Sequence, residues 1–341
     1  MNNPIIYSRY ANGVTLSQLL TDFGRTHELV KSADFHAQAE NENVATSRAI
    51  VLLDVDRAYF GALKAQAVLT VAEKTVKERQ LVADQVTELQ KNNMKSGLDV
   101  SFANVALQQA QLLLIQAQND LQASFAELST ALGYSGRRTF QLSDEPLPPA
   151  PPPEVTPLVD QALRERPELI TERLEENSAQ TYTKAERDLS FPTLSAFATA
   201  GLVPTGQEQL SSRYAAAGFN VNIPIFNGFL FSSLQDEAKS RAHAQEQHVR
   251  DLENRISQDV TTAWLEAVAA FKRLAVTEQL LDQANLALDL AQSRYTLGLS
   301  SIVELSQAQL NQTEAQIEQA SAKYDYAAQI SSLKYQMGVL R

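Results

Sequence analysis

Two short motifs in the sequence place a serine three residues before a carboxylate: Ser96 with Asp99, and Ser301 with Glu304. In such a capping box the serine side chain accepts a hydrogen bond from the backbone N–H of the acidic residue, and the carboxylate accepts one from the backbone N–H of the serine. Each motif therefore predicts the first turn of a helix. A cap uses one carboxylate oxygen, so Asp99 and Glu304 remain candidates for contacts beyond their own helix.

Residues that could support catalysis or metal binding are few. The sequence has no Cys, no Gly-rich phosphate loop, no Gly-x-Ser-x-Gly and no His-Glu-x-x-His, so we predict that the protein is not an enzyme and holds no metal or other cofactor. His243 and His248 are poorly spaced for one helical face, although Glu246 follows His243 by three residues. A solvated helix surface is favoured there over a metal site. The net charge of −11 argues against a nucleic-acid partner.

The stretch 293–310 is flanked on both sides by apolar residues at helical spacing. Gly298 can adopt the left-handed conformation that ends one helix, and Ser301 begins the next. Two long antiparallel helices are therefore predicted to meet at a tight tip near 298–301. The predicted helix from 26 to 90 would be on the order of 95 Å long at 1.5 Å per residue, a length typical of coiled coils and tubes.

The same pattern occurs twice, at an offset of 205 positions. Ser301 matches Ser96, Glu304 matches Asp99, and Gly298 matches Asn93, the next residue most tolerant of a left-handed turn. The register extends over roughly eighty residues, which indicates a tandem duplication of one helical hairpin. The first tip is therefore predicted near 93–96.

The chain is predicted to consist of five segments. They are a partial first β-hairpin with one strand (1–24), a first long helical hairpin (25–140), a proline-rich linker and helix (141–190), a second β-hairpin (191–228) and a second long helical hairpin (229–341).

Apolar and polar residues alternate over 194–202 and again over 219–225, which predicts two strands. With their flanking residues these runs approach the roughly ten residues that a tilted strand needs to cross a bilayer, and the polar positions are Asn, Ser and Thr rather than charged residues. An ordinary hairpin on a soluble protein is the alternative. Open strand edges are not tolerated in lipid, so a membrane hairpin predicts oligomerisation. The residues predicted to face lipid are Phe219, Val221, Ile223 and Ile225.

Several motifs together resemble the outer-membrane efflux family typified by TolC. The second tip reads R-Y-x-x-G-L-x-S-x-x-E-L, and four further motifs occur in the order found in the family. The resemblance implies a mainly α fold with a few membrane β-strands: a trimer in which long α-helical hairpins form a periplasmic tube joined to an outer-membrane β-barrel. The four further motifs are Asp22-Phe23-Gly24, Arg166-Pro167-Glu168-Leu169, Phe191-Pro192 and Phe226-Asn227-Gly228.

The resemblance also implies a function and a set of partners. It implies an outer-membrane channel subunit of a tripartite efflux or secretion system: a passive export duct opened at its periplasmic tip. The partners would be two further copies of the chain, a periplasmic adaptor protein, an inner-membrane pump reached through that adaptor, and outer-membrane lipid. A soluble coiled-coil scaffold protein is the alternative from another class.

The family's functional positions lie at the two tips. In the family a ring of side chains closes the tube end, and the apex residues meet the adaptor. The residues matching the closed ring are Asp99, Tyr295, Ser300, Glu304 and Gln307, and those matching the adaptor contact are Asn93, Met94, Lys95, Ser96, Gly298, Leu299, Ser300 and Ser301.

The beginning of the sequence departs from the family pattern. It has neither a basic region nor an apolar region typical of a signal peptide, and nothing before the first hairpin corresponds to the helical segment 155–190 or to strand 193–203. Family members supply four strands per copy, whereas three are predicted here. We therefore expect a fragment that starts inside the first β-hairpin.

Overall fold

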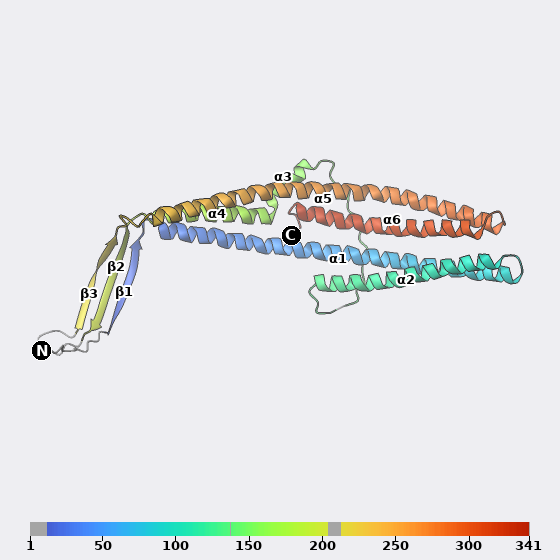
Figure 1. The fold of residues 1–341 in the computed structure, drawn as a ribbon, viewed down its shortest axis with the longest axis horizontal. Coiled ribbons are helices and arrows are strands. Elements are labelled where there is room, and N and C mark those ends of the chain that lie inside the picture. Colours follow the sequence, from blue (N-terminus) through green and yellow to red (C-terminus); the bar gives the residue numbers. More distant parts are fainter. Residues whose placement is uncertain (1–11, 137, 204–212, 341) are drawn as a thin grey trace, which may run out of the picture. The chain divides into compact units, whose positions relative to one another are not determined.

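A computed structural model describes residues 12–136, 138–203 and 213–340. Most of the chain is helical, and the chain forms two compact units, one from 1–43 and 168–252 and the other from 44–167 and 253–341. We name these the strand unit and the tip unit. The elements, in chain order (Figure 1), are β1 (Asn12–Thr21), α1 (Arg25–Lys91), α2 (Gly97–Ala131), α3 (Thr156–Glu165), α4 (Pro167–Asp188), β2 (Thr193–Leu202), β3 (Arg213–Asn222), α5 (Leu230–Thr296) and α6 (Ile302–Gln336).

The helices confirm the internal duplication. α1 and α5 have 67 residues each, α2 and α6 have 35 each, and both pairs are offset by the predicted 205 positions. The returning helices also end alike, because Gly133 and Gly338 both have positive φ, 76° and 74°. The two hairpins therefore share one backbone plan.

The strand unit contains an antiparallel sheet in the order β1-β2-β3. β2 pairs with both neighbours, so Leu16, Ala198 and Ala217 lie in one row across the sheet, and Thr15, Thr199 and Ala216 lie in the next. Paired residues share a face, so the first row belongs to an apolar face and the second to a more polar face. The hydroxyls of Thr15 and Thr199 are 3.1 Å apart on that polar face.

The predicted limits of the third strand are wrong. β3 runs from Arg213 to Asn222, so it starts earlier than 219 and leaves Ile223 and Ile225 outside the sheet. Phe219 and Val221 do lie on the apolar face, opposite Ala196 and Leu194. Val221 is the second-last residue of its strand, far from the strand's midpoint. Residues 204–212, between β2 and β3, lie outside the described residues.

The strand unit also contains α4 and the neighbouring ends of α1 and α5. Its clearest interhelical contact is a buried serine pair, in which the Ser32 hydroxyl donates to the Ser178 carbonyl oxygen at 3.0 Å and the Ser178 hydroxyl donates to the Ser32 carbonyl oxygen at 2.9 Å. Gln245 of α5 donates to the Glu172 carboxylate of α4 at 2.5 Å. α4 is thus bonded to both long helices.

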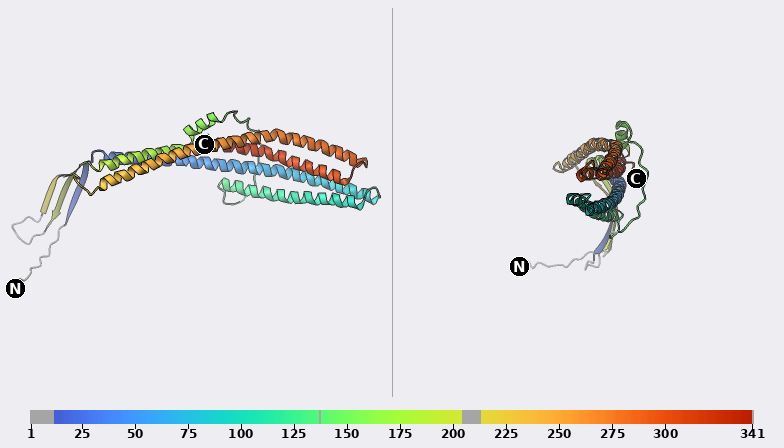
Figure 2. Two further views of the ribbon diagram at one scale, coloured as in Figure 1. Left: turned by 45° about the horizontal axis from the view of Figure 1, so that its top comes forward. Right: turned by 90° about the vertical axis from the view of Figure 1, so that its right-hand side faces the viewer.

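In the tip unit the two helical hairpins lie side by side (Figure 2). Arg79 of α1 is buried and donates to the Gln309 carbonyl oxygen of α6 at 2.7 Å and to the Thr313 hydroxyl at 3.1 Å. The proline-rich linker is held against this unit, since Trp264 donates to the Pro152 carbonyl oxygen at 2.8 Å. Trp264 is only half-buried, so its role is to bond the linker as well as to pack.

α2 carries an apolar surface that the chain itself covers little. Within the described ranges, α2 is the one helix that is long and apolar enough to cross a membrane by length and composition, and 17% of its most apolar window is buried. Such a property is weak evidence for a membrane span, because helices packed in other ways share it. Exposed apolar residues on α2 include Leu98, Val105, Leu112 and Ile115.

Candidate functional site at the helical tips

Both helical tips are closed by the same turn. At the second tip Gly298 has φ 74°; its N–H donates to the Tyr295 carbonyl oxygen at 3.1 Å, and that of Leu299 donates to the Arg294 carbonyl oxygen at 2.8 Å. These two bonds form a Schellman motif, which satisfies the last carbonyl groups of a helix. At the first tip Asn93 has φ 57°, and the equivalent N–H groups make the same two bonds at 2.9 Å each. The predicted tip positions and their left-handed residues are therefore confirmed.

The first tip contains the complete capping box that the sequence predicts. The Asp99 N–H donates to the Ser96 hydroxyl at 3.2 Å, and the Ser96 N–H donates to the Asp99 carboxylate at 2.9 Å. The Ser96 hydroxyl also donates to that carboxylate at 2.7 Å. Because these bonds favour the charged form, the pKa of Asp99 lies below its ordinary value, with the Ser96 hydroxyl as the largest cause.

The second tip does not contain the predicted capping box. Ser301 takes the extended N-cap conformation but makes no side-chain cap bond to any described residue. Glu304 instead accepts a hydrogen bond from the Arg294 Nε at 2.8 Å, across the turn. The residue equivalent to Arg294 at the first tip is Leu89, which cannot compete for Asp99. The arginine therefore explains why one carboxylate caps its helix and the other links two helices.

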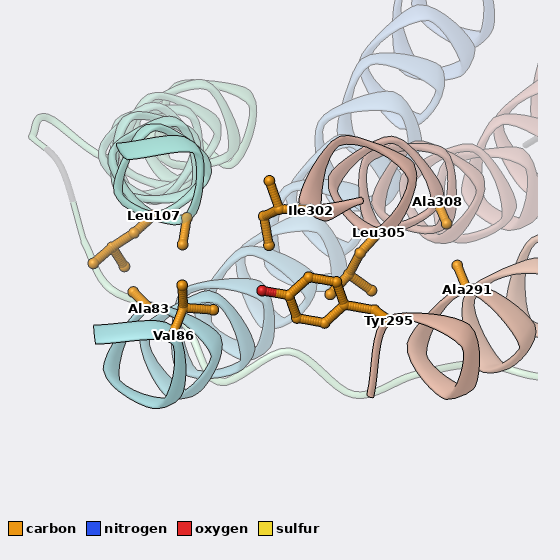
Figure 3. Close-up of a cluster of buried hydrophobic side chains, with 9 residues drawn as sticks. Ala83, Val86, Leu107, Ala291, Tyr295, Ile302, Leu305 and Ala308 are labelled. Carbon is orange, nitrogen blue, oxygen red and sulfur yellow. The ribbon is translucent and has the colours of Figure 1, made fainter. Parts of the chain in front are cut away.

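Tyr295 lies between the two tips. Its side chain is 6% exposed and belongs to an apolar cluster with Val86, Ile302 and Leu305, toward which its ring points (Figure 3). The Lys95 ammonium lies 3.8 Å from the centre of the Tyr295 ring, a cation–π contact that joins the first tip to α5. Burial, with a smaller contribution from the nearby Asp99 charge, raises the pKa of Tyr295.

The Tyr295 hydroxyl is buried but makes no hydrogen bond to any residue in the described part of the chain. The Ser300 hydroxyl has the same property. A buried hydroxyl without a partner costs about 1–3 kcal/mol. The second tip therefore contains two hydroxyls that the chain covers without bonding them to a described residue.

The remaining predicted tip residues are placed as follows. Gln307 is exposed and donates to Asn311 of its own helix at 2.8 Å, so the structure does not bring it to the Lys95–Tyr295 contact. Met94 and Leu299 are exposed at the apex. Sequence reasoning missed Arg294 as the partner of Glu304; the signal available was its difference from Leu89 at the duplicated position. The other apex positions, Asn93, Ser96, Gly298 and Ser301, are exposed too.

The sequence matches the profile of the family described as "Outer membrane efflux protein" over residues 2–134 and 158–339. The chain belongs to this family. It is 23% identical over 355 residues to the outer membrane protein TolC of Escherichia coli, an alignment that covers 97% of this chain and 72% of that protein. It is 25% identical over 351 residues to the alkaline protease secretion protein AprF of Pseudomonas aeruginosa, covering 98% of this chain and 70% of AprF.

A solved structure of the outer-membrane channel OprN shows the same fold. It matches 97% of this chain and 80% of its own chain with a TM-score of 0.83 at 18% identity. The expected TolC-like fold is therefore confirmed.

Membership in the family decides between the two function classes considered above. The family consists of outer-membrane channels for efflux and secretion, so the chain is a transport protein of the outer membrane rather than a soluble scaffold. Its class of function is transport, and the tip geometry must be understood as part of a channel.

Proposed function

We propose that this protein is one of three identical subunits of a passive export duct that spans the outer membrane and extends into the periplasm. The observation that carries the proposal is the sheet of the strand unit. Its apolar face is solvent-exposed in the single chain, with Phe219 73% and Val14 77% exposed. A soluble protein has no reason to keep such a face, whereas a lipid-facing band requires one.

The edges of this sheet support assembly. Within the described part of the chain β1 and β3 each pair on one side only, so each leaves a row of backbone donors and acceptors free. Such edges must be paired in a bilayer. β1 and β3 run in the same direction, since each is antiparallel to β2. Antiparallel closure between copies then needs one more strand per copy, in agreement with the four strands that the family resemblance implies.

The tips are the proposed docking site for the other components of a tripartite system. A periplasmic adaptor would contact the apex residues 93–96 and 298–301, and an inner-membrane pump would be reached through that adaptor. Exposed Met94 and Leu299 offer apolar contact area at the apex, and the turn geometry keeps their backbone fixed. The relative AprF is named as an alkaline protease secretion protein and the relative TolC as an outer membrane protein. Both names support a role in export for this chain.

The contacts around Tyr295 are proposed to hold the duct closed at the tip. In three copies, the Lys95–Tyr295 contact and the Arg294–Glu304 bond are repeated around one ring. The Tyr295 hydroxyl itself is covered by the chain's own apolar cluster, so the proposed gate rests on these two contacts. Hydrogen bonds to charged groups are worth roughly 1.5–3 kcal/mol each, so a few of them around a ring can hold a balanced equilibrium closed.

The trimer is tested by the mass of the purified full chain. Native mass spectrometry of the detergent-extracted protein from the outer-membrane fraction should give three copies per particle. A monomer that fractionates with soluble protein would refute the proposal.

The gate is tested by Tyr295→Phe combined with Glu304→Gln. This double variant keeps the side-chain sizes, changes the ring that contacts Lys95 and removes the charge that Arg294 bonds, so the open state should be favoured and single-channel conductance should rise. Tyr324→Phe is the matched control, because the Tyr324 hydroxyl bonds Asp144 of the linker instead. Unchanged conductance in the double variant, with intact trimers, would remove Tyr295 and Glu304 from the gate.

A further inference from the structure

We propose that His36, Glu40 and Glu175 of the strand unit form a binding site for a divalent transition-metal ion of the Zn²⁺ type. His36 and Glu40 lie one turn apart on α1, and Glu175 comes from α4. Each offers one ligand atom, and these atoms all lie within 4.8 Å of one another. The His36 Nδ1 is 2.5 Å from a Glu175 carboxylate oxygen, so the two helices already bring an imidazole and a carboxylate into contact.

The donor set selects the class of ion. One imidazole nitrogen and two carboxylate oxygens are ligands that Zn²⁺ accepts at about 2.0–2.2 Å, with a fourth position left for water. Mg²⁺ and Ca²⁺ prefer oxygen ligands throughout, so the histidine argues against them. Cu(I) prefers sulfur, and this set contains none. Small side-chain rotations suffice to bring three atoms at this spacing onto one ion.

The backbone around the site is fixed on both sides by buried contacts. Four residues before His36, Ser32 exchanges hydrogen bonds with Ser178 of α4. Three residues after it, the carbonyl oxygen of fully buried Ala39 accepts a bond of 3.4 Å from the Thr171 hydroxyl. Glu175 lies between Ser178 and Thr171 on α4. The three ligands therefore belong to two helices whose register is locked, which preorganises a metal site.

The duplicated positions of α5 provide an internal comparison. At the offset of 205, His36 corresponds to Arg241 and Glu40 corresponds to Gln245. Gln245 donates to Glu172 of α4, and Arg241 donates to Glu237 of its own helix at 2.5 Å. At the two duplicated positions, α5 thus has an arginine and a glutamine, whereas α1 has a histidine and a glutamate that can both bind a metal ion. The contact of α4 with a long helix does not by itself require metal ligands, since the α5 side dispenses with them.

A bound ion would connect α1 to α4 and neutralise two carboxylates that otherwise repel each other. It would therefore stabilise the strand unit, by an amount that grows with the logarithm of the free-ion concentration once that concentration exceeds the Kd. This inference departs from the sequence-based prediction of no metal, which considered only histidines within one helix. The sequence signal was the four-residue spacing of His36 and Glu40; the third ligand is distant in the chain.

The test uses the untagged full-length chain in detergent and Zn²⁺ alone as the probe. Equilibrium dialysis should show one saturable Zn²⁺ per chain. His36→Ala and Glu175→Gln each remove a direct ligand, so each should weaken binding by more than the roughly tenfold that loss of an outer-shell partner costs. His243→Ala is the matched control: His243 is also exposed on a helix and lies 3.2 Å from a single carboxylate, Glu246, and its removal should leave affinity unchanged.

Zinc-edge X-ray absorption on the wild-type protein gives a result that needs no variant. One imidazole with oxygen ligands is expected. Absence of saturable Zn²⁺ binding, wild-type affinity in His36→Ala, or two or more imidazoles on the ion would each overturn the proposal. Circular dichroism shows whether a variant that loses binding has kept its helices.

Discussion

The two tips differ in how their returning helices begin, and this difference predicts unequal effects of equivalent serine substitutions. Ser96→Ala removes the hydroxyl that accepts from the Asp99 N–H and donates to the Asp99 carboxylate. Ser301→Ala removes a hydroxyl that makes no cap bond to the described residues. Both serines are exposed N-cap residues at duplicated positions, so each is the control for the other.

The loss of helix stability expected for each substitution follows from the hydrogen bonds that it removes. Replacing an N-cap serine by alanine costs about 1 kcal/mol where the cap is made, and close to nothing is expected at Ser301. Because 1.36 kcal/mol corresponds to a tenfold change, a loss of about 1 kcal/mol should speed exchange through local opening about fivefold. The contribution of the Asp99 carboxylate has a predictable pH dependence. Its pKa is lowered in the folded state, so this stabilisation is complete above the unfolded-state value and is lost as the pH falls through the folded-state value.

Hydrogen–deuterium exchange with mass spectrometry measures the local opening of each helix start, on peptides covering residues 97–102 and 302–307. Faster exchange is expected only in the first peptide of Ser96→Ala, and the second peptide of Ser301→Ala should match the wild type. When the pH is lowered below about 4, the exchange rate of the first peptide in the wild type, corrected for the intrinsic rate, should approach the rate measured in Ser96→Ala. Equal acceleration at both tips would refute the assignment of one capping box and one cross-turn bond.

Two further matched pairs test the sheet and the helix ends. Ala217 lies on the apolar face of β3 and Ala216 on the polar face. Ala217→Arg should therefore raise the free energy of membrane insertion by about 2–4 kcal/mol near the midplane, and Ala216→Arg by much less. Equal tolerance of the two substitutions in a folding assay with lipid vesicles would exclude a lipid-facing band. Gly133→Ala should cost about 1–2 kcal/mol for its left-handed backbone alone. Gly338→Ala should cost more in urea unfolding, because its Cβ would lie 2.8 Å from the Arg166 Cα, and a smaller effect at Gly338 would contradict the packing.

The sequence was sufficient to predict the repeated parts of the fold, which are the two helical hairpins and their tips. A register held over a long helix requires agreement at many positions, so the offset of 205 predicted two hairpins whose helices have equal lengths. The tips could be predicted because Asn93 and Gly298 are among the few residues that tolerate positive φ.

Competing partners and weak local preferences account for the errors. Glu304 was predicted to cap its helix, but Arg294 lies ten residues earlier and reaches it only after the turn has formed. The start of β3 was missed because residues 214–218 are mainly Ala and Gly, which have low strand propensity; pairing with β2 decides their conformation. The cluster at His36 was missed because Glu175 follows it by 139 residues.

We propose that copies of this chain form a water-filled channel across a membrane. Planar-bilayer recording of the purified full-length protein tests it most directly. Stepwise increases in ion current are expected as single oligomers insert, with larger steps for Tyr295→Phe combined with Glu304→Gln. If both the wild type and the double variant co-float with lipid vesicles yet give no current steps, the chain does not form an open water-filled channel.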